Sequence, residues 1–430
     1  MRIAKSVQDL EAYTPGEQPK TRLAVKLNTN ENPYLPSPKC AQALNGFDMD
    51  RLRRYPDPVF AALRNRIAKI WKTSPERVFV GNGSDEVLAL AAKAFVEDSE
   101  AIGSLDPSYS LYRTLAAIRN VRFVPTPLKD DFTWNGKIVA RNASGNEVSL
   151  FLLTNPNAPT GVPTPIEMVS AAARRFKGVM VVDEAYADFA NKNCMELATA
   201  KSNRNVIVMR TFSKSFSLAG LRVGYCIGPE DLIAALYKVK DSYNVDALAQ
   251  SVALAALNDL PWMRANARKV IRTRKRVAKA LEKMGWDVLP SESNFLFARP
   301  ASKCAGELFA ALRERGIFVR YFKGPRTGDR LRITIGTDEQ MDALLAHLRS
   351  GKPWTEPMQK AVNLMRSYMV RYSDTANFTP NEMKSLLDRL QTLMDADADT
   401  FAPYHASSEY RRNHFKPYEN KKSNPAYIFI

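Results

Sequence analysis

Histidine and cysteine are scarce in this chain of 430 residues. The four cysteines are widely separated in the sequence: Cys40, Cys194, Cys226 and Cys304. No Cys-x-x-Cys pair exists, so neither a zinc cage nor a dense disulfide framework is expected, and we expect reduced thiols. Only three histidines are present, all late in the chain: His347, His405 and His414. With so few histidines, the sequence does not favour a histidine-based metal site or a Ser/His/Asp triad. We therefore predict no metal.

Long apolar runs are also missing, because the longest of them are far shorter than a membrane span. The opening "MRIAKSVQDLEAY" has no apolar region after its basic residues, so we expect a cytoplasmic protein. The net charge is +17, from 62 basic and 45 acidic residues. This balance alone leaves nucleic acid, a membrane surface and small anionic substrates open. The charges of residues 1–350 are scattered rather than blocked together, as on a solvated surface or in phosphate-binding clefts.

What the sequence does contain is an alternation of short apolar runs with helical patterns. Seven runs are predicted strands: 78–82, 100–106, 121–125, 149–155, 178–184, 205–210 and 222–228. Helical patterns such as 86–96 and 165–176 lie between them. This alternation indicates an α/β fold with a mostly parallel sheet. In such sheets the active site gathers at the carboxyl ends of the strands.

The same patterns divide the chain into parts. We predict that residues 1–45 form an N-terminal arm and part of a small domain. Residues 46–264 are predicted to form a large α/β domain, and residues 265–350 the rest of the small α/β domain. A long helical stretch, roughly 230–283, leads into the smaller domain. In 351–430 we predict a helical hairpin, with a capping box at "TPNE", followed by a basic and aromatic tail of unknown role.

Lys214 lies in "RTFSKSFSLAGLRVGY", directly after a predicted strand. A lysine amine attacks a carbonyl only when it is neutral, so a desolvated lysine at the rim of a sheet suits a Schiff base with an aldehyde such as pyridoxal 5′-phosphate (PLP). The Ser213 hydroxyl can donate a hydrogen bond to a phosphate, and the Arg222 guanidinium can bind the same group in a bidentate manner. The plain alternative is a solvated surface cation, which this setting disfavours.

Two further motifs suit the same cofactor. "GNGSDE" places Ser84 and Asp85 at a predicted helix start, where backbone amides bind anions, although such a cap is more often only structural. "VVDEAY" places Asp183 at the end of a buried strand, where a carboxylate needs a partner such as a protonated pyridine nitrogen. The alternative for Asp183 is a helix cap. Near it, "NPNAPTG" is a turn that offers Asn157, a weak signal alone.

These motifs, in this order, resemble fold-type I PLP-dependent aminotransferases of class II, and most closely the histidinol-phosphate aminotransferase branch. The resemblance covers about residues 20–350. It rests on these motifs: "LNTNENPY", "RRYPDP", "GNGSDE", "DPSYSLY", "NPNAPTG", "DEAY", "TFSKSFSLAGLRVGY", "SNFLFAR", "GIFVRYF" and "LRITIGT". The family often has asparagine before "PTG", whereas this chain has Ala158.

The resemblance implies a role for each matching residue. Lys214 would form the Schiff base and move the proton, with Asp183 at the ring nitrogen. Tyr186 and Asn157 would approach the ring oxygen, and Tyr109 would stack on the ring. The phosphate contacts would be Ser84, Asp85, Ser213, Arg222, and Tyr55 from a second subunit. The substrate contacts would be Arg332, Arg320 and Asn32.

The resemblance therefore implies a homodimer with shared active sites that transfers an amino group from L-histidinol phosphate to 2-oxoglutarate in histidine biosynthesis. Other PLP enzymes of this fold stay open as alternatives, namely a threonine-phosphate-type decarboxylase or an aromatic aminotransferase. A more distant alternative is a PLP-domain regulator that binds nucleic acid through its basic tail. We expect small-molecule substrates, with no nucleic acid and no membrane as partners.

Overall fold

A computed structural model describes residues 16–19, 24–200, 202, 204–301 and 304–350, together with the single positions 3, 8, 388 and 392. Residues 25–341 belong to one compact unit. The hairpin and tail predicted for 351–430 lie outside the described residues. Within the described part of the chain, no helix is both long and apolar enough to cross a membrane.

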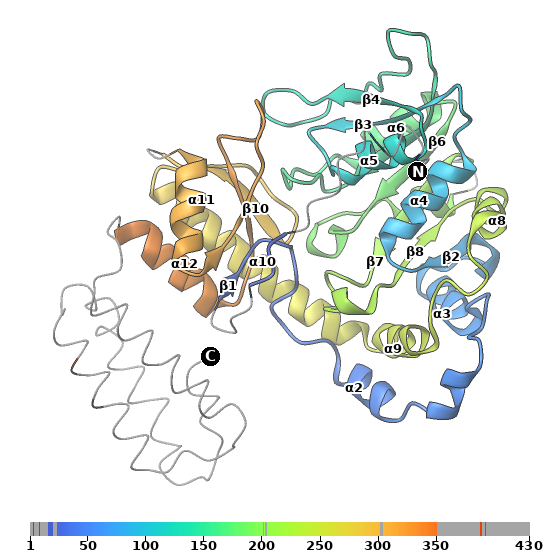
Figure 1. Cartoon of the computed structure of the whole chain (residues 1–430), viewed down its shortest axis with the longest axis horizontal. Helices are drawn as coiled ribbons and strands as arrows, with labels where there is room; N and C mark the ends of the chain where they lie inside the picture. Colours follow the sequence, from blue (N-terminus) through green and yellow to red (C-terminus); the bar gives the residue numbers. More distant parts are fainter. Residues whose placement is uncertain are drawn as a thin grey trace. The chain divides into compact units, whose positions relative to one another are not determined.

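The compact unit is built on a seven-stranded sheet, drawn in blue to green in Figure 1. Its order is β2-β8-β7-β6-β5-β3-β4, and only β8 runs antiparallel to its neighbours. The bounds are β2 Val78–Gly81, β3 Ala101–Asp106, β4 Arg122–Pro127, β5 Val148–Thr154, β6 Val179–Asp183, β7 Val206–Thr211 and β8 Gly224–Ile227. The prediction of a mostly parallel seven-stranded sheet is confirmed. Strands buried on both faces have near-continuous apolar sequences, which is why each could be found.

Helices cover both faces of this sheet, because alternate strand residues enter two different apolar clusters. Val206 and Val208 of β7 belong to one cluster, whereas Ile207 and Met209 belong to the other. The first cluster includes α3 Ala61–Trp71, α6 Ile166–Arg175, α7 Met195–Thr199 and α9 Ala247–Leu257; the second includes α4 Ser84–Ala94, α5 Leu111–Ile118 and α8 Glu230–Val239. The large sheet is therefore covered by helices on both of its faces, and the carboxyl ends of its strands lie between these two helical layers.

The stretch predicted as helical over about 230–283 is divided into three helices: α8, α9 and α10 Leu260–Lys283. The first break has a local cause. The Asp246 side chain accepts a hydrogen bond from Ala249 N at 2.8 Å and so begins α9. Pro261 lies in the first turn of α10, where its missing N–H costs nothing.

A smaller, four-stranded sheet follows, in the order β12-β13-β10-β9. Its strands are β9 Asp287–Val288, β10 Phe295–Arg299, β12 Arg320–Tyr321 and β13 Leu331–Thr334. Helix α11 Ala305–Glu314 lies between β10 and β12 in the sequence, and α12 Asp338–Ser350 follows β13. The short β1 Val25–Lys26 pairs in parallel with β11 Ile317–Phe318, so this N-terminal strand lies beside the smaller α/β part of the chain (Figure 1). Before α3, the chain forms α2 Pro38–Asn45 and a short 3-10 helix, Met49–Arg53.

Candidate active site

Lys214 lies in the loop directly after β7, at the carboxyl end of a parallel strand, as predicted. Its side chain is half-buried, and Nζ donates a hydrogen bond to the Thr29 carbonyl at 3.1 Å. Nζ also lies 6.0 Å from the centre of the Tyr186 ring. Desolvation, reinforced by the positive charge of Arg332, lowers the pKa of Lys214 to about 8. An appreciable fraction of this amine is therefore neutral near neutral pH, as a nucleophile requires.

An anion cradle forms where the start of α4 meets Arg222. Gly83 precedes α4 with φ 84° and provides no side-chain cap, so the first-turn amides of Ser84 and Asp85 are open to another acceptor. The Arg222 guanidinium lies 3.3 Å from Ser213 Oγ and 3.3 Å from Asp85 Oδ2. A Cβ atom on Gly83 would come within 2.7 Å of the Arg222 guanidinium, so glycine is what allows this approach.

Asp183 ends β6 as a buried carboxylate. Tyr112 donates a hydrogen bond to its Oδ2 at 2.8 Å, and the Ala185 amide donates to its Oδ1 at 3.1 Å. Both donors are neutral, and none of the ion pairs in the described part of the chain includes this carboxylate. Burial raises the pKa of Asp183 to about 6. The site therefore holds a buried acid whose ionised form would be stabilised by a cationic ligand.

Tyr186, Tyr109 and Asn157 lie around these groups. The Tyr186 hydroxyl accepts a hydrogen bond from Asn30 at 3.0 Å, and its ring meets Phe295 edge to face. Tyr109 meets the Tyr112 ring edge to face, and its hydroxyl lies 3.5 Å from Asp85 Oδ1. The Asn157 amide donates to the carbonyl of Pro107 and to Thr160 Oγ1, both at 3.1 Å, and so supports its own loop.

An N-terminal strap, residues 25–34, crosses the site and was only partly foreseen. Asn28 O accepts from Arg332 at 3.0 Å, and Thr29 O accepts from Lys214. The Asn32 side chain donates to the carbonyls of Lys214 and Ser215 at 3.1 and 3.2 Å. Asn32 therefore fixes the backbone that carries the lysine, and its contact with a substrate stays a prediction.

Arg320 and Arg332 face each other across the antiparallel pair β12 and β13. Directly opposite residues project to the same face of a sheet, so two guanidinium groups share one region. Arg332 packs over the rings of Phe295 and Phe322, with 5.3 and 5.1 Å to the centroids. Like charges placed in this way repel, and an anionic ligand between them would relieve the repulsion.

A buried ion-pair cluster behind the lysine loop was missed by the sequence analysis. Arg210 of β7 binds Glu184 Oε2 at 2.8 Å and Asp188 Oδ1 at 2.7 Å. Asp188 also accepts a hydrogen bond from Ser215 at 2.5 Å. The cluster thus anchors the residue next to Lys214. The only signal in the sequence was the single charge inside an otherwise apolar strand.

Comparison with known proteins accounts for this arrangement. The family model described as aminotransferase class I and II matches residues 23–348. The chain belongs to the class I and II aminotransferase family. The chain is 44% identical over 350 residues to histidinol-phosphate aminotransferase 1 of Burkholderia pseudomallei, covering 80% of this chain and 96% of the relative. Histidinol-phosphate aminotransferase of Acetobacter pasteurianus is 43% identical over 347 residues, with coverages of 80% and 96%.

Among solved structures, this aminotransferase is similar to the histidinol-phosphate aminotransferase of Sinorhizobium meliloti in complex with pyridoxal 5′-phosphate. The TM-score is 0.72 with 26% sequence identity, and the match covers 82% of this chain and 98% of that one. The resemblance deduced from the motifs and the fold-type I assignment are thereby confirmed.

Proposed function

We propose that this aminotransferase uses PLP to transfer the amino group of L-histidinol phosphate to 2-oxoglutarate, giving imidazole-acetol phosphate and glutamate. The observation that carries the proposal is the set of groups at the carboxyl ends of β2, β6 and β7. There the structure brings together an amine with a lowered pKa, a buried carboxylate and an anion cradle. The names of the curated relatives support histidinol phosphate, and they do not favour the decarboxylase, aromatic aminotransferase or regulator alternatives.

The residues present fit PLP at three points. The α4 amides, Ser213 and Arg222 would hold its phosphate, and Asp183 would pair with its ring nitrogen. Tyr109 would stack on the ring, while Tyr186 and Asn157 would approach the ring oxygen. When bound, PLP supplies an aldehyde that links to amines and a protonated ring that accepts an electron pair.

Lys214 has two tasks in this proposal. Its neutral amine, favoured by the pKa of about 8, is the nucleophile that holds the cofactor. Once the substrate amine takes its place, Nζ would remove the proton from the substrate carbon and then, as the conjugate acid, deliver it to the former aldehyde carbon of the cofactor. Asn32, Ser215 and the Arg210 cluster keep the loop in place, so the amine moves little between the two tasks.

Arg320 and Arg332 would recognise the substrates. Histidinol phosphate carries a phosphate and 2-oxoglutarate carries two carboxylates, so one site must accept different oxyanions. Guanidinium groups bind both phosphate and carboxylate groups through bidentate hydrogen bonds. The pairing of Arg320 with Arg332 across the sheet places two such groups together.

The first prediction tests the reaction directly. Purified protein loaded with PLP is expected to lose the visible absorbance of the bound cofactor when histidinol phosphate is added. The absorbance should return with 2-oxoglutarate, because the second half-reaction restores the starting form. Stopped-flow absorbance measures both steps. Phenylalanine and threonine phosphate serve as comparison substrates, and faster loss with either one, or release of CO₂, would contradict the assignment to histidinol phosphate.

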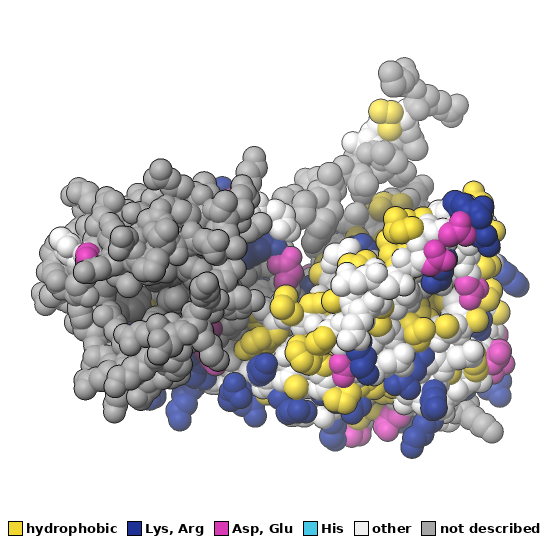
Figure 2. All heavy atoms as spheres, turned by 90° about the horizontal axis from the view of Figure 1, so that it is seen from below, with side chains coloured by type: hydrophobic (Ala, Val, Ile, Leu, Met, Phe, Trp, Pro, Cys, Tyr) yellow, Lys and Arg dark blue, Asp and Glu magenta, His cyan; other side chains and the backbone are white. Residues whose placement is uncertain are grey.

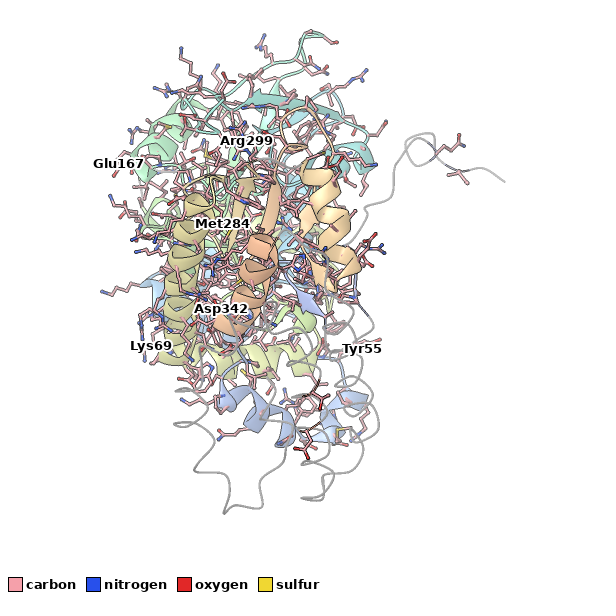
Figure 3. The ribbon with its side chains drawn as sticks, turned by 90° about the vertical axis from the view of Figure 1, so that its left-hand side faces the viewer. Tyr55, Lys69, Glu167, Met284, Arg299 and Asp342 are labelled. Carbon is pink, nitrogen blue, oxygen red and sulfur yellow. The ribbon has the colours of Figure 1, made fainter. Side chains whose placement is uncertain are left out.

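We also propose that the enzyme is a homodimer in which Tyr55 of each subunit contacts the phosphate at the other site. Tyr55, which is labelled in Figure 3, is 80% exposed. Its ring stacks on that of Tyr243, with 4.3 Å between the ring centroids. Large apolar side chains are exposed nearby in the sequence and on α10: Leu35, Leu44, Met49, Leu52, Val59 and Trp262. Figure 2, which views the side where α2 lies, shows hydrophobic side chains gathered on this face. Exposed apolar patches of this kind support a protein interface.

A mixing experiment tests the shared site. Tyr55→Ala is expected to weaken PLP affinity about 10-fold, because a hydrogen bond to a charged group is lost. At a limiting PLP concentration, at which Tyr55→Ala alone is nearly inactive, a mixture of refolded Tyr55→Ala and Lys214→Ala subunits should show roughly one quarter of the wild-type activity at that concentration, since half of the dimers are mixed and each of these holds one intact site of two. Activity no higher than the average of the two separate variants would contradict the shared site, as would a monomer by light scattering.

A further inference from the structure

Two neutral side chains, Tyr112 and Thr154, form a hydrogen-bonded chain that ends at Asp183. Tyr112 of α5 is completely buried, and its hydroxyl lies 2.8 Å from Asp183 Oδ2. Thr154, the last residue of β5, is 1% exposed, and its Oγ1 lies 2.6 Å from the same hydroxyl. Neither residue belongs to the site predicted from the sequence.

The chemistry of the three groups sets the direction of these bonds. An ionised carboxylate only accepts, so the Tyr112 proton points to Asp183. The Thr154 hydroxyl must therefore donate to the Tyr112 oxygen. The result is a directed chain, Thr154 to Tyr112 to Asp183, in which the two consecutive hydrogen bonds strengthen each other.

The chain favours the charged form of Asp183. Burial, with the nearby charges of Asp85 and Glu184, raises the pKa of this carboxyl, while the bonds from Tyr112 and the Ala185 amide oppose that rise. Without the phenol, the carboxyl would keep one donor and become easier to protonate. A neutral carboxyl cannot pair with a protonated ring nitrogen.

We propose that Tyr112, supported by Thr154, is a positioning residue that keeps Asp183 ionised and aimed at the pyridine nitrogen of the cofactor. This inference rests on the proposed binding of PLP at Asp183. It assigns the effect to one atom of the ligand, the ring nitrogen. A residue that only supports the packing of α5 against the sheet would act on the whole ligand.

A cofactor analogue separates these two roles. Apoenzyme carrying Tyr112→Phe is titrated with PLP and with 1-deaza-PLP, in which carbon replaces the ring nitrogen, and the dissociation constants are measured by fluorescence quenching. PLP affinity is expected to fall about 10-fold, and deaza-PLP affinity by no more than about twofold. The phenyl ring is retained in this variant, so its edge-to-face contact with Tyr109 persists.

Thr154 provides a second, independent test if Tyr112→Phe does not fold. Thr154→Val, which removes the hydroxyl at nearly constant volume, should weaken PLP binding about threefold and leave deaza-PLP binding unchanged. Thr154→Ser should restore the affinity for PLP. Tyr237→Phe is the matched control, because it removes a tyrosine hydroxyl that bonds the Val78 carbonyl at 3.4 Å.

The outcomes are distinct. Selective loss of PLP affinity supports the inference. Equal loss for both ligands, or no loss for either, overturns it. Wild-type protein that binds neither ligand would instead refute the proposed function. Equal affinity of the wild-type protein for both ligands would show that Asp183 does not pair with the ring nitrogen. That result would also overturn the inference about Tyr112.

Discussion

Replacing Lys214 with alanine is expected to lower the rate of transamination by about 10⁴-fold or more. The variant loses both the nucleophile that holds the cofactor and the base that moves the proton, and no other lysine in the described part of the site takes its place. Steady-state turnover of histidinol phosphate with 2-oxoglutarate measures the loss.

The same substitution should leave the fold intact. Alanine removes the bond from Nζ to Thr29 O, but Asn32 still binds the backbone carbonyls of residue 214 and Ser215. We expect a melting temperature within about 4 °C of the wild type. PLP should still bind through its phosphate and ring, without a covalent link. Lys279→Ala, on the exposed face of α10, is the control and should retain normal turnover.

A pH measurement links this loss to the local electrostatics. In wild-type apoenzyme the rate of covalent attachment of PLP should rise as pH increases through about 8, because the neutral fraction of the Lys214 amine rises through its pKa. A lysine in a model peptide would show the same rise near pH 10.4. A rate that still increases above pH 10 would contradict the lowered pKa.

Asp183→Asn is expected to reduce kcat/KM by about 10²- to 10⁴-fold. Asparagine keeps the shape of the side chain, but it has no charge to stabilise a protonated ring nitrogen. Removing one partner of a buried ion pair costs about 3–5 kcal/mol, and each 1.36 kcal/mol is a factor of ten. Steady-state kinetics with both substrates measures the effect.

Two controls make the Asp183 result specific. Asp287→Asn changes a half-exposed carboxylate that pairs with Arg330 and Arg299 in the smaller sheet, and it should leave kcat/KM within about twofold. With deaza-PLP as cofactor, Asp183→Asn should change affinity little, since no ring nitrogen is present. Normal kcat/KM in Asp183→Asn would show that this carboxylate does not serve the reaction.

The sequence was sufficient for the large sheet because each of its strands is an apolar run that ends at a polar motif. Lys214, Asp183 and the start of α4 follow such runs, so topology alone brings them to one edge. The division of 230–283 into three helices was harder to foresee, because a single capping residue, Asp246, decides the first break.

The hydrogen-bond and ion-pair partners of the buried polar side chains could not be predicted from the sequence. Tyr112 and Thr154 resemble ordinary residues of an amphipathic helix and a strand end, and only their positions in space join them to Asp183. The Arg210 cluster likewise joins a residue of β7 to residues of the segments that follow β6 and β7. The domain boundaries, the cytoplasmic location and the absence of nucleic-acid partners stay predictions.

The strap over the active site also has a consequence for the order in which the enzyme is made. Asn30 N donates to Thr334 Oγ1 across 304 positions of sequence, and β1 is completed by β11. The strap leaves the ribosome roughly 15–60 s before its partners in β13 at usual rates of synthesis. The nascent chain therefore cannot complete this hydrogen-bonded site until β13 has emerged.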